Sequence, residues 1–231
     1  MSRTIVALDF PNRDEALRFL DLFSQPVYVK IGMELVYKEG FSIIDDIKAR
    51  GHKIFLDLKL HDIPNTVKNG MKSLAGKNVD LVNLHAAGGI EMMKKALEGL
   101  EEGASGQRPL CIGVTQLTST SQEVMTEELL IDRPIDEVVL KYAENCKKAG
   151  LDGVVCSVHE AAAIHERCGK DFLTVTPGIR LADDSADDQK RIATPEYAKE
   201  QGCDYIVVGR SITKSADPLA TYEKIEKIMR G

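Results

Sequence analysis

The chain has 231 residues, of which 43% are apolar and 29% charged, and its formal net charge is −6. This balance excludes an intrinsically disordered protein, and the even spread of Lys and Arg argues against nucleic-acid binding. No apolar run approaches the ~20 residues of a membrane span, and the N-terminus does not resemble a signal peptide, so we expect a cytoplasmic protein without membrane contacts.

Eight short runs rich in Val, Ile and Leu alternate with segments whose apolar residues have helical spacing. Strand alternating with helix predicts parallel βαβ units, and eight units most often close into a (β/α)8 TIM barrel. An open doubly wound sheet is the alternative, although no Gly-rich dinucleotide motif follows the first run. No linker divides the chain, so we expect one domain over residues 1–231. The runs cover residues 4–9, 27–32, 53–59, 81–85, 110–115, 153–157, 172–178 and 205–210.

The first two runs contain charged residues that a strand covered on both faces should lack. Asp9 ends the first run, and Lys30 interrupts the second. Side chains alternate between the two faces of a strand, so Val29 and Ile31 should face the helices while Lys30 points toward the barrel axis.

The third run carries two further charges, Asp57 and Lys59, on the same face as Phe55. Their spacing places them about 6.6 Å apart along the strand, close enough to interact strongly. Asp62 follows just past the run, so these charges gather at the C-terminal mouth, where barrel enzymes carry their active sites. A buried ion pair that only stabilises the mouth is the alternative, but burying ions rarely improves stability over apolar packing.

Two Gly-Arg pairs follow the seventh and eighth runs, where barrels frequently bind phosphate. Gly178 and Gly209 allow close backbone approach, and Arg180 and Arg210 supply guanidinium donors. The polar segment that follows Arg180 is long enough for a mobile lid, from which Gln189 could reach the phosphate. A solvated surface loop is the alternative interpretation.

The Cys and His residues lack the spacing of a metal site. Five Cys residues are scattered without a C-x-x-C pair, and the five His residues form no H-E-x-x-H motif. We therefore expect reduced thiols, several of them buried, and no metal.

The segment DLKLHDIPNT (57–66) resembles the D-x-K-x-x-D-I-x-x-T signature of the orotidine 5′-monophosphate decarboxylases. This signature is highly specific, and the resemblance runs in order over essentially the whole chain, closest to the short bacterial form. Further segments similar to that family are ALDF (7–10), VKIGMEL (29–35), TQLTS (115–119), TPGIR (176–180) and VVGRSIT (207–213).

The resemblance implies a homodimeric enzyme that decarboxylates orotidine 5′-monophosphate to uridine 5′-monophosphate, the last step of de novo pyrimidine nucleotide synthesis, with neither a metal nor an organic cofactor. Lys30, Asp57 and Lys59 would come from one subunit, with Asp62 and Thr66 from its partner. Ribose would contact Asp9 and Lys30, and the pyrimidine would lie near Thr118. The residues implied to bind phosphate are Gln189, Gly209 and Arg210, with Arg180 nearby.

Two other functions fit the barrel less well. Related barrels use the same D-x-K-x-x-D frame with Mg²⁺ to decarboxylate or condense sugar phosphates, but they carry an acidic metal ligand where this chain has Lys30. A barrel that only binds a nucleotide or sugar phosphate would leave Asp57 and Lys59 unexplained.

Overall fold

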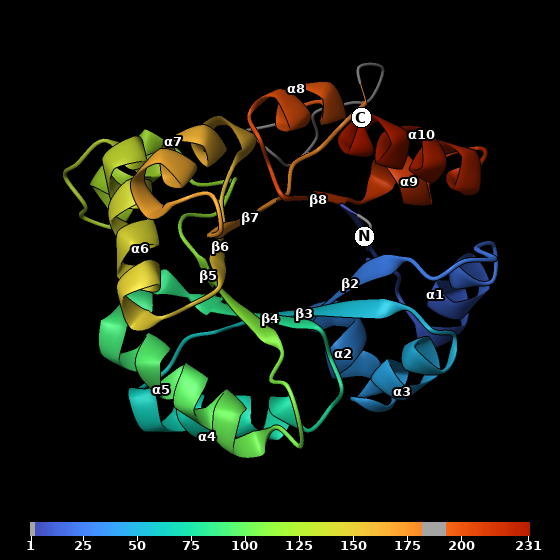
Figure 1. Ribbon diagram of the computed structural model, residues 1–231, viewed down its shortest axis with the longest axis horizontal. Coiled ribbons are helices and arrows are strands. Elements are labelled where there is room, and N and C mark those ends of the chain that lie inside the picture. The colour runs from blue at the N-terminus through green and yellow to red at the C-terminus, as the bar shows by residue number, and fades with distance from the viewer. Residues whose placement is uncertain (1–2, 182–192) are drawn as a thin grey trace.

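The computed structural model describes residues 3–181 and 193–231 and shows a closed barrel of parallel strands in chain order. Figure 1 looks into this ring, with helices around its outside. Each predicted run coincides with a strand to within a few residues, and closure between the first and last strands rules out the open sheet. The strands are β1 (Thr4–Ala7), β2 (Tyr28–Gly32), β3 (Lys53–Leu60), β4 (Leu81–His85), β5 (Leu110–Val114), β6 (Gly153–Val155), β7 (Leu173–Thr176) and β8 (Tyr205–Val208).

The helices begin and end where the sequence supplies caps. Asn12 accepts a hydrogen bond from the Glu15 amide at 2.9 Å at the start of α1, and Gly150 ends α6 with a φ of 92°. The helices are α1 (Arg13–Leu20), α2 (Met33–Glu39), α3 (Ser42–Ala49), α4 (Pro64–Ala75), α5 (Gly89–Gly103), α6 (Ile135–Ala149), α7 (Val158–Cys168), α8 (Pro195–Glu200), α9 (Arg210–Thr213) and α10 (Pro218–Arg230), with short helical turns over Ala86–Gly88 and Val124–Glu128.

The alternation of side chains along the strands produces two apolar cores. Val29, Ile31, Ile54 and Leu56 pack in the large core between barrel and helices, as the period-two pattern predicted. The opposite faces of the strands fill the barrel interior and form the floor below the C-terminal mouth. The interior residues are Ile5, Ala7, Tyr28, Phe55, Leu81, Ile112, Val175 and Val207.

The helices α4 and α5 pack with almost no side chain between them at two positions. A Cβ atom added to Gly99 would lie 2.1 Å from the Lys68 carbonyl oxygen, and one added to Gly103 would lie 2.2 Å from that of Lys72. Glycine therefore allows the backbones to approach closely and fixes how α4, which follows the segment containing Asp62, lies against the barrel.

The five Cys residues are free thiols, and all of them are buried. Burial penalises the thiolate and raises the pKa of Cys146 to about 12 and that of Cys203 to about 11. The expectation that several thiols are buried is thus confirmed. Among the described residues, no helix has both the length and the apolar character that a membrane span requires.

Candidate active site

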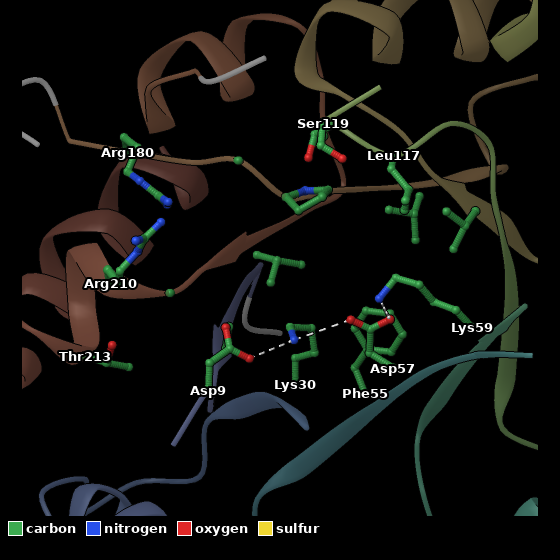
Figure 2. A pocket seen from close by; sticks show the side chains of 18 of the residues that line it. Asp9, Lys30, Phe55, Asp57, Lys59, Leu117, Ser119, Arg180, Arg210 and Thr213 are labelled. Atoms are coloured by element: carbon green, nitrogen blue, oxygen red, sulfur yellow. Dashed lines mark hydrogen bonds and ion pairs between the residues drawn. The ribbon is translucent and has the colours of Figure 1, made fainter. Parts of the chain in front are cut away.

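A cavity of about 740 Å³ opens at the C-terminal ends of the strands. Its lining comes from β1, β2 and β3 and from the segments that follow β5, β7 and β8. Figure 2 shows Arg180 and Arg210 on one side of this cavity and Asp57 and Lys59 on the other. The cavity therefore has two ends of different chemistry, joined by the apolar floor of the barrel.

Four side chains along one wall form a continuous series of alternating charges. Lys30 Nζ lies 3.2 Å from Asp9 Oδ1 and 3.4 Å from Asp57 Oδ2, and Lys59 Nζ lies 2.7 Å from Asp57 Oδ1. The Lys30 and Asp57 side chains are only 14% and 10% exposed, whereas that of Asp9 is 64% exposed. The series thus runs from the rim of the cavity into its interior (Figure 2).

The register of the first three strands produces this series. Ala7, the last residue of β1, pairs with Lys30, and Lys30 pairs with Phe55 of β3, so these two strands flank Lys30 from both sides. Asp57 pairs with Gly32 at the end of β2, and a Cβ on that glycine would come within 3.4 Å of Lys30 Nζ. That distance is an ordinary van der Waals contact, so the ammonium group of Lys30 lies directly beside the end of β2.

Lys59 departs from the regular strand that the sequence predicts. Its φ is 51°, a left-handed conformation that is uncommon for a residue with a side chain. Its amide donates to Asn83 Oδ1 at 2.8 Å, and Asn83 Nδ2 donates to Asp57 Oδ1 at 2.6 Å. Sequence reasoning missed Asn83, although an amide inside the apolar run LVNLH, two residues after the inward-facing Leu81, was a signal for it.

The opposite charges of the series stabilise one another in their ionised forms. Burial works against the ammonium of Lys30, but the nearby carboxylates of Asp57 and Asp9 outweigh it and raise the pKa of Lys30. Burial also disfavours the Asp57 carboxylate, but the ammonium groups of Lys30 and Lys59 hold the pKa of Asp57 below its usual range. Hydrogen bonds from Lys59 and Asn83 act in the same direction on that pKa. Asp57 is therefore an anion although it is buried.

The other end of the cavity carries the two arginines. Arg180 is 7% exposed and donates from its guanidinium to the Ile179 carbonyl at 2.9 Å. Arg210 is the first residue of α9, directly after Gly209, which borders the cavity beside Ala7. With Gly178 at a φ of 83°, these residues form a basic, close-approach surface suited to an anionic group.

The remaining predicted residues are placed as follows. Thr118 lines the cavity. Asp62 and Thr66 are exposed and are not part of its lining, and Asp62 Oδ1 accepts from the Ile63 amide at 2.6 Å. Gln189 and most of the predicted lid lie outside the described residues. Cavity residues that sequence reasoning did not single out include Ser119, Thr213 and Lys214.

A second, smaller cavity of about 190 Å³ lies against the same charges on the side of β2 and α2. It shares Lys30, Asp57 and Lys59 with the main cavity and is otherwise bordered by residues such as Met33, which is 44% exposed. The charged series is thus open to the exterior from a second direction.

The donor set at the charges does not suit a divalent cation. Each oxygen of Asp57 lies within ion-pair distance of a lysine ammonium, and Asp9 contacts the same Lys30 group. Within residues 3–181 and 193–231, no three His, Cys, Asp or Glu side chains are grouped so that they could hold a metal ion. The arrangement instead offers fixed positive and negative charges to a substrate.

Comparisons with known proteins agree with these features. A model of the orotidine 5′-phosphate decarboxylase / HUMPS family matches residues 2–225. The orotidine 5′-phosphate decarboxylase of Bacillus pumilus is 60% identical over 226 residues, which cover 96% of this chain and 97% of the relative. That of Geobacillus kaustophilus is 58% identical over 230 residues, which cover 98% and 94%.

Solved structures extend the similarity to three dimensions. The crystal structure of orotidine 5′-phosphate decarboxylase from Lactobacillus acidophilus has a TM-score of 0.90 and 44% identity, and the match covers 100% of both chains. The crystal structure of an uncharacterized conserved protein from Geobacillus kaustophilus has a TM-score of 0.88 and 53% identity, covering 98% of this chain and 99% of the other.

Proposed function

The chain belongs to the orotidine 5′-phosphate decarboxylase / HUMPS family, and from this premise we propose that it converts orotidine 5′-monophosphate to uridine 5′-monophosphate and CO2 without metal or cofactor. It is an enzyme of the carboxy-lyase class. The observation that carries the proposal is the series of alternating charges from Asp9 to Lys59, which lies at one end of a nucleotide-sized cavity whose other end is basic.

The chemistry requires a positive charge beside the reacting carbon. When the bond between C6 and the carboxylate breaks, its electron pair stays on C6 in the plane of the pyrimidine, where no conjugated electron sink receives it. The ammonium of Lys59 stabilises the developing carbanion and then transfers a proton to C6, which completes uridine 5′-monophosphate. Asp57 opposes the leaving carboxylate, and Lys30 holds Asp57 in place.

Magnitudes favour carbanion stabilisation over substrate repulsion. Two like charges ~4 Å apart at an effective dielectric constant of ~20 repel by about 4 kcal/mol. Enzymes lower barriers by about 8–23 kcal/mol, and a decarboxylation without an electron sink belongs near the upper end. The repulsion between Asp57 and the substrate carboxylate therefore supplies a minor part of the reduction in the activation barrier. The positive charge of Lys59 supplies a larger part.

The rest of the nucleotide is assigned along the cavity. Its phosphate binds at Arg180, Gly209 and Arg210, with Gln189 of the proposed lid. Its ribose hydroxyls meet Asp9 and Lys30, and its pyrimidine lies near Thr118. Binding energy at the phosphate end, far from the reacting carbon, holds the substrate carboxylate beside Asp57.

A homodimer completes the proposed site. Asp62 lies on the segment after β3 and Thr66 in the first turn of α4, and both are exposed and outside the lining of their own cavity. The smaller cavity leaves the charged series accessible beside the exposed Met33, so a carboxylate from a second copy of this chain could enter there. We therefore assign Asp62 and Thr66 to the site of the partner subunit.

The test is turnover of orotidine 5′-monophosphate by the purified protein, followed by loss of substrate absorbance in the presence of EDTA. Full activity with EDTA is expected, because no step uses a metal ion. Activity that EDTA abolishes and Mg²⁺ restores would assign the chain to the metal-dependent reaction. Tight nucleotide binding without turnover would show a binding protein instead.

A further inference from the structure

Asn83 is buried within the barrel, is 1% exposed, and lies outside the lining of the cavity. Its side-chain amide contacts two members of the charged series, accepting from the Lys59 amide at 2.8 Å and donating to Asp57 Oδ1 at 2.6 Å. We propose that Asn83 is a positioning residue for the decarboxylation, an inference that rests on the proposed function. It holds the Lys59 backbone and the Asp57 carboxylate in one fixed arrangement without touching the substrate.

The strand register explains why a side chain is needed at this point. Leu56 pairs with Val82, but the next pair is Leu60 with Leu84, so β3 advances four residues while β4 advances two. The extra residues form a bulge in which the backbone of Lys59 is left-handed. The Asn83 side chain accepts the hydrogen bond of the Lys59 amide there, in place of a backbone carbonyl.

Because of the bulge, the side chain of Lys59 turns back toward Asp57 on the same strand. In a regular strand, Asp57 and Lys59 would project in parallel about 6.6 Å apart. Here the Lys59 ammonium and the Asn83 amide share the same oxygen, Asp57 Oδ1, at 2.7 and 2.6 Å. The other oxygen faces Lys30 at 3.4 Å, so the carboxylate is held from both sides and cannot rotate freely.

Replacement of Asn83 by Leu tests the inference with a side chain of similar size and no polar atoms. The variant leaves the Lys59 amide unsatisfied and removes one of the bonds that fix Asp57. We expect kcat to fall on the order of 10²-fold, since displacement of a catalytic group by about 1 Å has an effect of this size. KM should change little, because the phosphate end of the cavity is untouched.

Replacement of Asn83 by Asp supplies a readout that a merely structural role would not change. When protonated, the Asp side chain reproduces Asn: its hydroxyl donates to Asp57 Oδ1, and its carbonyl oxygen accepts from the Lys59 amide. When ionised, it places a second negative charge beside Asp57 and loses the donor. The kcat of Asn83→Asp should therefore rise toward the wild-type value as pH falls and drop as pH rises, shifting its pH profile to the acid side.

Thr174→Val is the matched control. Thr174 is also a fully buried polar residue on a strand, but its hydroxyl bonds to Asp204 at 3.1 Å and it does not line the cavity. The Thr174→Val substitution should lower the thermal unfolding temperature about as much as the Asn83 substitutions do. It should leave kcat and the pH profile of kcat as in the wild type.

The inference is overturned if Asn83→Leu keeps kcat within threefold of the wild type, or if the pH profile of Asn83→Asp is parallel to that of the wild type. Should Asn83→Leu not fold, the Asn83→Asp profile decides alone. A crystal structure of a soluble Asn83 variant adds a readout independent of turnover: Lys59 should leave the left-handed region and move away from Asp57. If the wild type itself fails to decarboxylate the substrate, the proposed function is wrong, and this structural comparison still tests the positioning role.

Discussion

Asp57 is a buried anion that depends on its neighbours for its charge. Its carboxylate accepts hydrogen bonds from Lys59 and Asn83 and faces Lys30, and together these groups hold its pKa below the usual value against the effect of burial. Since the carboxylate is only 10% exposed, solvent screens these interactions weakly. The same pairing raises the pKa of Lys30.

The stability of the protein should therefore depend on pH through Asp57. A carboxylate with a depressed folded-state pKa stabilises the fold above its unfolded pKa of about 3.9, and this contribution is lost as pH falls through the folded-state pKa. The difference in unfolding free energy between the wild type and Asp57→Asn should be constant near neutrality and shrink in acid. The slope of this difference against pH should not exceed about 1.4 kcal/mol per pH unit, which is the limit for the uptake of one proton. Urea denaturation across the acid range measures it.

The exposed Asp171 provides the control for that measurement. The difference between the wild type and Asp171→Asn should stay small at every pH studied. A wild-type advantage over Asp57→Asn that grows as pH falls would contradict the depressed pKa of Asp57.

At the residue level, the sequence identified the charged groups but not how they are held. The period-two pattern of β2 and β3 was sufficient to place Lys30, Asp57 and Lys59 on one face. The left-handed Lys59 and its bond to Asn83 depend on a register shift between β3 and β4, which arises from pairing between distant segments. No local pattern encodes that pairing.

At the level of elements, the packing of α4 on α5 depends on glycine. A methyl group at Gly99 would overlap the Lys68 carbonyl, so Gly99→Ala must push the two helices apart or distort one of them. We expect this substitution to lower the unfolding free energy by about 1–3 kcal/mol, as overpacking does elsewhere. Thermal or urea denaturation provides the measurement.

Gly76→Ala is the matched control, because it lies at the end of α4 with a right-handed φ of −74° and its nearest neighbour to an added Cβ is 3.9 Å away. It should leave the stability unchanged or slightly higher. Equal stability of the Gly99→Ala and Gly76→Ala proteins would contradict this, because it would show that the α4 and α5 backbones can separate without a loss of stability.

The sequence located the elements better than it located their ends. The first run was predicted to continue to Asp9, but β1 ends at Ala7, since pairing with the neighbouring strands stops there. Phe23 continues the helical spacing of Ala16 and Leu20, yet α1 ends at Leu20, and the Phe23 ring centroid lies 5.5 Å from that of Tyr222 on α10. Leu8 and Phe23 are both buried although they lie just past the ends of β1 and α1. Apolar spacing therefore reports burial, and a buried residue need not belong to the element.

At the scale of the whole molecule, the proposed dimer predicts that two inactive variants restore each other. Lys59→Ala and Asp62→Ala should each lower kcat by about 10²–10⁴-fold, the range for loss of a proton-transferring or supporting charge. In a hybrid dimer, one site receives Lys59 from one chain and Asp62 from the other. Random exchange should therefore restore about a quarter of the wild-type activity, because half of the dimers are hybrids with one intact site.

Subunit exchange must be demonstrated in the same mixture, for example by recovery of a tagged and an untagged chain together. A mixture of Lys59→Ala with Lys59→Ala carrying a different tag controls for recovery without complementation. If proven hybrids stay inactive, Asp62 acts within its own chain or has no part in the reaction.

The positions of the five buried thiols allow the opening of the barrel to be followed chemically. Cys111, Cys146, Cys156, Cys168 and Cys203 all lie between β5 and the start of β8, so the first four strands contain none. A thiol shielded in this way reacts with an alkylating reagent only when its surroundings unfold. Mass spectrometry of the alkylated protein would therefore distinguish a barrel that opens as one cooperative unit, with five labels gained together, from one whose second half loosens stepwise.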